Sequence, residues 1–220
     1  MEIKKISEVL KMNWLRKYWQ DIGGIVALLV FGGILINQQH MEEIKVILWL
    51  SFAAILVHQF EEYRWPGYFP GIFNVVIFNS KTPERYPLNR QSAMVINLLI
   101  AYVFYLVPVF FVDCVWLGLA PIFMGFFQLI WHGVFANRKA KTIYNPGLFA
   151  VLLLHIPVGS WYIQYIVSHG MVAISDWVAG SIYFIAATYV LIIKGNMWMK
   201  NEKTQFAFSA TQLGPYSSKE

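Results

Sequence analysis

The chain has 220 residues, of which 58% are apolar and only 13% are charged, and its formal net charge is +5. A soluble domain is usually about 45–50% apolar and about 25% charged, and a chain of this length cannot hide so much apolar surface in its own core. These values exclude a soluble enzyme, a disordered chain and a nucleic-acid-binding module as first interpretations, and they predict a protein partly surrounded by lipid.

Residues 1–20 form a charged segment that precedes the first long apolar run. Ile3, Ile6, Leu10 and Trp14 recur there at helical spacing, followed by Lys17. We expect an amphipathic helix that lies on the membrane surface.

Six apolar stretches follow, each long enough, or nearly so, to cross a bilayer, which takes about 20 helical residues. They cover residues 22–36, 44–60, 91–112, 115–135, 147–167 and 172–193. Because lipid offers no hydrogen-bond partners to the backbone, each must be a helix. The predicted fold class is all-α: a polytopic membrane bundle of six transmembrane helices over residues 21–195, preceded by the interfacial helix.

Two further segments do not span. Residues 65–80 join a turn-forming aromatic stretch to the short apolar run 72–78, for which we expect an interfacial or re-entrant position. Residues 196–220 form a polar tail, expected to be mobile from residue 201 onward.

The basic residues are distributed on one side only. Sixteen of the 17 Lys and Arg residues fall in the N-terminal segment, the second and fourth loops and the tail, and only Lys45 falls in an odd-numbered loop. Positive-inside sorting produces this pattern. It predicts a multi-pass protein of the cell inner (plasma) membrane with both termini in the cytoplasm.

Polar residues gather at the cytoplasmic end of the second span. His58, Glu61 and Glu62 stand three and four residues apart, so one helix face can present all three. Two carboxylates at a helix C-terminus oppose the helix dipole. Near lipid they need a metal ion, a nearby cation such as Arg64, or a proton.

Other spans carry polar residues at the same membrane depth. His132 lies late in the fourth span, Asn97 early in the third and His155 early in the fifth, with Asn137 and Asn145 at the same face. We expect His58, Glu61, Glu62, His132 and Asn97 to share one pocket. Ordinary interpretations stay open: His132 as an interfacial anchor, Asn97 as an interhelical hydrogen bond, His155 as a packed core residue and Asn145 as a helix cap.

The run His58-Gln59-Phe60-Glu61-Glu62, followed by Tyr63 and Trp65-Pro66, resembles the HXXEE-domain family of small bacterial membrane proteins. His132 and the later Tyr144-Asn145-Pro146-Gly147 are similar features, and the resemblance covers roughly residues 45–190. It implies that the family's polar set is His58, Glu61, Glu62 and His132. It also implies an enzymatic function but identifies no substrate.

The leading hypothesis is an integral-membrane enzyme, a hydrolase or acid–base catalyst, acting on a lipid or other amphiphile at the cytoplasmic leaflet. In one version His58, Glu61, Glu62 and His132 bind a divalent ion such as Zn, Fe or Mn. In the metal-free version one glutamate is the acid and a histidine the base. The alternatives are a small proton-coupled transporter and a non-catalytic membrane subunit. Nucleic acid is not an expected partner, and the oligomeric state is open.

Overall fold

The computed structural model describes residues 2–217, with side chains from residue 12 onward. Every regular element in this part of the chain is a helix. Six helices are long and apolar enough to cross a membrane: Met12–His40, Glu43–Tyr63, Arg90–Phe110, Val115–Ala140, Leu148–Ser168 and Ile174–Met199. The predicted all-α bundle of six spans is therefore confirmed, and the chain is a multi-pass membrane protein.

Four of the six spans change from α-helix to π-helix along their length. The second span is the continuous helix α2 (Glu43–Tyr63). The later spans consist of α4 (Arg90–Leu99), η3 (Ile100–Tyr105) and η4 (Val107–Phe110); α5 (Val115–Gln128), η5 (Leu129–Ala136) and α6 (Asn137–Ala140); α7 (Leu148–Ala150), η6 (Val151–His155) and α8 (Ile156–Ser168); and α9 (Ile174–Ala187), η7 (Thr188–Lys194) and α10 (Gly195–Met199). A π-helical stretch changes the register of the side chains that follow it, and such stretches are frequent at functional sites.

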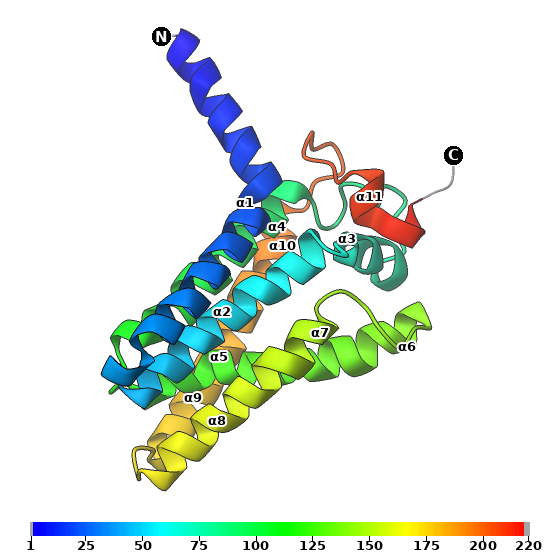
Figure 1. Ribbon diagram of the computed structural model, residues 1–220. Coiled ribbons are helices and arrows are strands. Elements are labelled where there is room, and N and C mark those ends of the chain that lie inside the picture. Colours follow the sequence, from blue (N-terminus) through cyan, green and yellow to red (C-terminus); the bar gives the residue numbers. More distant parts are fainter. Residues whose placement is uncertain (1, 218–220) are drawn as a thin grey trace.

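The first span belongs to a longer helix. α1 (Glu2–Asn37) runs without a break from the segment predicted to lie on the membrane into the first span, and η1 (Gln38–His40) ends it (Figure 1). Three residues of the predicted amphipathic face, Ile3, Ile6 and Leu10, lie outside the described side chains. An interfacial position for this segment stays a prediction.

α2 is the central helix of the bundle. In its most apolar window 67% of the residues are buried, against 17% for the sixth span, whose side chains face outward. α1 packs along α2, and α5 packs along α9 (Figure 1). His58, Glu61 and Glu62 near the end of α2 are therefore enclosed by protein and not by lipid.

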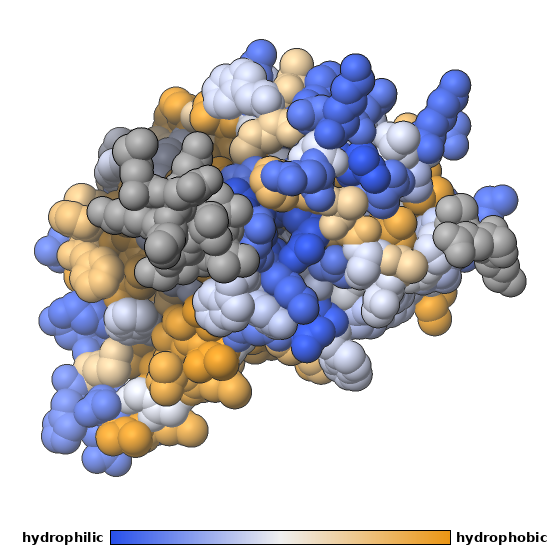
Figure 2. Space-filling model, turned by 90° about the horizontal axis from the view of Figure 1, so that it is seen from above, coloured by the Kyte–Doolittle hydropathy of each residue, from blue (hydrophilic) through white to orange (hydrophobic). Residues whose placement is uncertain are grey.

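An even number of spans places both described chain ends at one end of the bundle, which we call the terminal end. The second loop folds there into α3 (Phe69–Gly71) and the π-helical η2 (Ile72–Ile77). Figure 2, seen from this end, shows polar residues gathered over its centre with apolar residues beside them.

The tail is folded as far as the structure describes it, up to residue 217, which corrects the expectation of a mobile segment. It forms α11 (Ala210–Leu213) and η8 (Gly214–Tyr216), and Phe208 and Leu213 are buried in an apolar cluster with residues of α1, α2, α3 and α4. The Leu213 carbonyl oxygen lies so close to Gly71 that a Cβ at this position would clash with it. The tail therefore packs against the second loop beside α3.

Candidate metal centre

The second span brings a histidine and a carboxylate onto one face. His58 and Glu62 are four residues apart on α2, and His58 Nε2 lies 3.5 Å from Glu62 Oε1. Their exposed fractions are only 1% and 6%. Side chains four residues apart lie on the same face of a helix, so the motif alone brings His58 and Glu62 together.

His132 approaches the same carboxylate oxygen from the fourth span. It lies in η5, is 0% exposed, and its Nε2 is 3.4 Å from Glu62 Oε1. The rings of His58 and His132 meet edge-on, with centroids 4.9 Å apart. The three residues offer ligand atoms within 4.8 Å of one another, a grouping suited to a metal ion.

Asn145 fixes which nitrogen of His132 is available. Its Nδ2 donates to the His132 carbonyl at 2.8 Å and to Asn137 Oδ1 at 2.7 Å. This orientation turns Asn145 Oδ1 toward His132 Nδ1, 2.5 Å away. An amide oxygen only accepts, so His132 Nδ1 carries the hydrogen and a neutral ring presents a lone pair at Nε2. Orienting partners of this kind are typical of metal-binding histidines.

The Nε2 atoms of His58 and His132 are buried and have no hydrogen-bond partner among the described residues. A protonated imidazole would donate to a carboxylate at about 2.7–2.9 Å, shorter than the 3.4 and 3.5 Å observed. If His58 takes the same tautomer as His132, two nitrogen lone pairs face one carboxylate oxygen, and a cation between them would remove their repulsion. The donor set therefore fits a metal ion.

Two of the three donor separations can be compared with metal geometry. Donors about 2.0–2.1 Å from a tetrahedral zinc ion lie about 3.3–3.4 Å apart. The distances from Glu62 Oε1 to the two Nε2 atoms, 3.4 and 3.5 Å, are close to that value, and all three ligand atoms lie within 4.8 Å of one another.

Arg64, the cation that the sequence offers nearby, is engaged elsewhere. Its Nε donates to Asp21 Oδ1 at 2.7 Å at the protein surface. Among the described side chains, the ion-pair partners of Glu62 are the two histidines, and no Lys or Arg pairs with it. Of the solutions open to a buried carboxylate here, a metal ion is the one this environment suits.

Glu61 faces away from this group, although we expected it among the ligands. One residue before Glu62, it points about 100° around the helix. Its oxygens accept hydrogen bonds from the Phe149 and Ala150 amides at 3.1 and 2.8 Å and from the Tyr144 hydroxyl at 2.8 Å. Burial raises the pKa of Tyr144, and the hydrogen bond to Glu61 raises it further, so Tyr144 remains a donor.

The fifth span therefore begins with a cap from another helix. Glu61 satisfies amides that the first turn of a helix leaves unpaired. The helix start predicted at Asn145-Pro146-Gly147 is confirmed, but Asn145 is not its cap, because its side chain is used to hold His132.

Gly147 lets the chain pass close to both imidazoles. Its φ is +104°, a conformation that favours glycine. A Cβ at this position would lie 2.6 Å from His132 Cε1 and 2.9 Å from His58 Cε1. Sequence reasoning assigned no such role to Asn145 or Gly147; the signal was the Tyr-Asn-Pro-Gly run, which we interpreted as a helix start.

Asn97 does not reach the centre. Its Nδ2 donates to the Ala93 carbonyl within α4 at 2.8 Å, and its backbone carbonyl accepts from Gln59 Nε2 at 2.9 Å. The hydrogen bond between the second and third spans is thus made by the Gln59 side chain to the Asn97 backbone, whereas the Asn97 side chain stays within its own helix.

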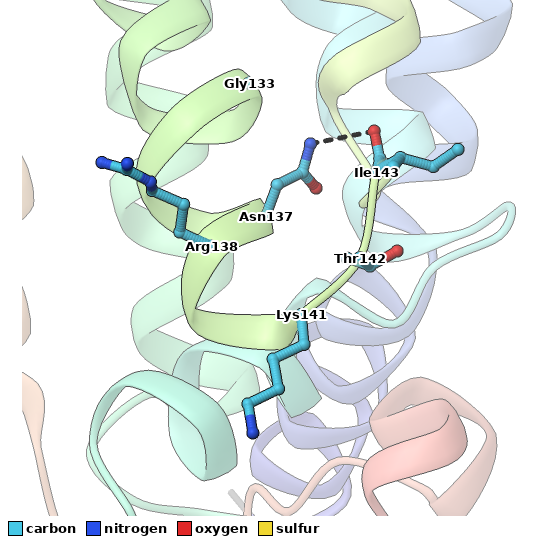
Figure 3. Close-up of a pocket in the computed structure, with 6 residues that line it drawn as sticks. All are labelled: Gly133, Asn137, Arg138, Lys141, Thr142 and Ile143. Atoms are coloured by element: carbon cyan, nitrogen blue, oxygen red, sulfur yellow. Dashed lines mark hydrogen bonds between the residues drawn. The ribbon is translucent and has the colours of Figure 1, made fainter.

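Asn137 lies at the edge of a shallow surface pocket behind His132. Its amide donates to the Ile143 carbonyl, and the pocket is completed by Gly133, Arg138, Lys141 and Thr142 (Figure 3). The side chains of Arg138 and Lys141 point away from each other in Figure 3. The pocket thus does not gather its basic groups around one point, and its link to the centre is the Asn137–Asn145 hydrogen bond.

We predict that Glu61→Gln lowers the free energy of unfolding by about 1–3 kcal/mol. Both carboxylate oxygens of Glu61 accept buried hydrogen bonds, and in glutamine an NH2 group, which cannot accept them, replaces one of these oxygens. Unfolding in mixed detergent micelles measures the change. Glu43→Gln is the matched control, since Glu43 is exposed and accepts a single bond from Trp161. Equal stability of the two variants would contradict the assigned role of Glu61.

Comparison with known proteins finds a family that is defined by the same His-x-x-Glu-Glu motif. The family model described as "Protein of unknown function with HXXEE motif" matches residues 49–162, more than half of the chain. No curated protein and no solved structure matches. The match includes His58, Glu61, Glu62 and His132, and it begins and ends within the second and fifth spans. The chain therefore belongs to the family of HXXEE-motif proteins of unknown function.

Proposed function

We propose that this chain is an integral-membrane hydrolase with a divalent-metal centre formed by His58, Glu62 and His132, acting on a lipid or other amphiphile. The observation that carries the proposal is the pair of unpartnered, buried Nε2 atoms facing one carboxylate oxygen. A folded protein rarely leaves such atoms unsatisfied.

The ligand set favours catalysis over a purely structural ion. Two histidines and one glutamate supply three protein ligands, which is typical of catalytic zinc sites that keep a position open for water. Iron in oxygenases takes a similar set in octahedral geometry, and manganese prefers harder, oxygen-rich sites. Because the two distances from Glu62 Oε1 are closer to a tetrahedral edge than to an octahedral one, we propose Zn ahead of Fe and Mn.

A zinc ion held at this site would lower the pKa of a coordinated water to about 7 and so would supply hydrolytic chemistry near neutral pH. His58, Glu62 and His132 would hold the ion. Asn145 orients His132, and Glu61 fixes the start of the fifth span beside them.

The depth of the centre supports an amphiphilic substrate. His58 stands five residues before Tyr63, the last residue of α2, which is about 7.5 Å of helix. Polar linkages of a lipid lie between the headgroup and the acyl chains, in the interfacial region outside a hydrocarbon core about 30 Å thick. A lipid can therefore bring such a linkage to the centre while its chains stay in the bilayer.

The orientation of the protein completes the proposal. Sixteen of the 17 basic residues fall in the N-terminal segment, the second and fourth loops and the tail, and basic loops favour the cytoplasm. We place this end, with the metal centre, at the cytoplasmic leaflet of the inner membrane.

We expect an impermeant maleimide to label Cys114 in intact spheroplasts. Cys114 is the only cysteine and is exposed between the third and fourth spans, at the end of the bundle away from the termini. The control is Cys114→Ser combined with Glu202→Cys, which moves the thiol to the tail and should require lysis for labelling. The reverse pattern would invert the orientation.

The purified protein is expected to contain about one zinc ion per chain by elemental analysis. His58→Ala, Glu62→Gln and His132→Ala should each lower the metal content at least tenfold, because each removes one of three ligands. His169→Ala is the control, since His169 is exposed at the opposite end and contacts Tyr165. Metal-free wild type, or variants that retain full metal, would reject the centre.

Turnover should depend on the same residues. We expect the zinc-loaded protein in proteoliposomes to release a fragment from some member of a total membrane-lipid extract, detected by mass spectrometry. A chelator should stop the release and zinc restore it, and Glu62→Gln should reduce it by two orders of magnitude or more. A metal-bound protein without any turnover would favour the alternatives of a carrier or a non-catalytic subunit, which flux measurements on the same liposomes separate.

A further inference from the structure

The two histidines of the metal centre differ in how their second nitrogen is held. His132 Nδ1 is fixed by Asn145. His58 Nδ1 is buried and has no hydrogen-bond partner among the described residues. A histidine that binds metal through Nε2 carries its hydrogen on Nδ1 and normally donates it to a carboxylate, a carbonyl or water. The proposed centre therefore lacks one of its orienting contacts.

Two more unpartnered groups lie on the inner side of His58. The ring of His155 meets the His58 ring edge-on, with centroids 5.4 Å apart, and the ring of Tyr105 meets His155 at 5.9 Å. His155 Nε2 and the Tyr105 hydroxyl are both buried without a hydrogen-bond partner among the described residues. Three polar groups from the second, third and fifth spans thus follow one another into the bundle.

The surrounding elements close this region off from lipid. Tyr105 and His155 are 1% and 4% exposed. Gly125 of the fourth span packs against His155, where a Cβ would lie 3.0 Å from Nδ1. Tyr105 ends the π-helical stretch η3, and His155 ends η6. Two π-helical stretches thus end on the residues that bring polar groups toward His58.

A buried polar group without a partner destabilises the fold, and buried water typically makes about three hydrogen bonds to such groups. We propose that His58 Nδ1, His155 Nε2 and the Tyr105 hydroxyl enclose one ordered water molecule. The water accepts the hydrogen of His58 Nδ1, donates to His155 Nε2 and bonds the Tyr105 hydroxyl. His155 and Tyr105 are then positioning residues, which act on the metal by fixing the ring of His58.

This inference rests on the proposed metal centre and extends it to residues outside the motif. Loss of a partner that orients a metal-binding histidine typically costs about 10–100-fold in metal affinity. Tyr105→Phe removes one oxygen atom and leaves the ring packing intact. His155→Phe keeps an aromatic ring and removes both nitrogens, whereas His155→Gln keeps an oxygen that accepts a hydrogen bond.

The experiment is a zinc titration of the metal-free, full-length protein against a competing chelator. We expect Tyr105→Phe and His155→Phe to weaken zinc binding at least tenfold, and His155→Gln to restore part of the loss. Tyr162→Phe is the control, because Tyr162 is equally buried but donates to the Val115 carbonyl away from the centre. Cobalt-loaded samples give a second readout: the ligand-field spectrum should shift in the first two variants and not in the control.

The outcomes separate this inference from the proposed function. If the wild type binds no zinc, the metal centre itself is wrong. If the wild type binds zinc and Tyr105→Phe matches Tyr162→Phe in affinity and in cobalt spectrum, the bridging water is wrong and the centre stands. Should His155→Phe fail to fold, Tyr105→Phe alone still decides the question, since it changes a single atom.

Discussion

The structure of this protein depends on a carboxylate placed between two imidazoles inside a membrane-spanning bundle. An ionised group in this environment is costly unless it is paired. Three separate parts of the chain meet to surround Glu62: its own helix with His58, the π-helical stretch with His132, and the loop that ends at Gly147. The central position of α2, the most buried span, makes this meeting possible, because the first, third, fourth and fifth spans all pack against it.

The two adjacent glutamates illustrate how one residue of helical rotation separates two tasks. Glu61 has its oxygens satisfied by Tyr144 and by two amides of the fifth span, so it has little capacity left for an ion. Glu62 faces imidazole nitrogens instead. The first carboxylate holds the helices in the arrangement that the second one needs. A substitution at Glu61 therefore acts on the centre through the placement of Gly147, whereas one at Glu62 acts on it directly.

Much of this could be predicted from the sequence, because hydropathy finds the spans and the spacing of His58 and Glu62 places both on one helix face. The position of His132 in the membrane plane could not, since the π-helical stretches break the 3.6-residue register on which such reasoning depends. Asn145 has the pattern of a helix cap, and only the approach of the fourth span gives its amide a better partner. The tail was expected to be mobile because its composition is polar, but Phe208 and Leu213 pack onto a surface that the second loop forms only in the folded protein.

The position of the centre along the membrane normal bears on the kind of function that it serves. Carriers that alternate between two sides generally hold their substrate near the midplane, where repeats meet. Here His58 and Glu62 lie within about two helical turns of one end of α2, and the buried pair Tyr105 and His155 follows on their inner side. Under the proposed function, a lipid would approach this centre from one leaflet without crossing the bilayer. Access from one leaflet is sufficient for an enzyme that releases its product to the same leaflet, but not for a carrier that must also open to the other side.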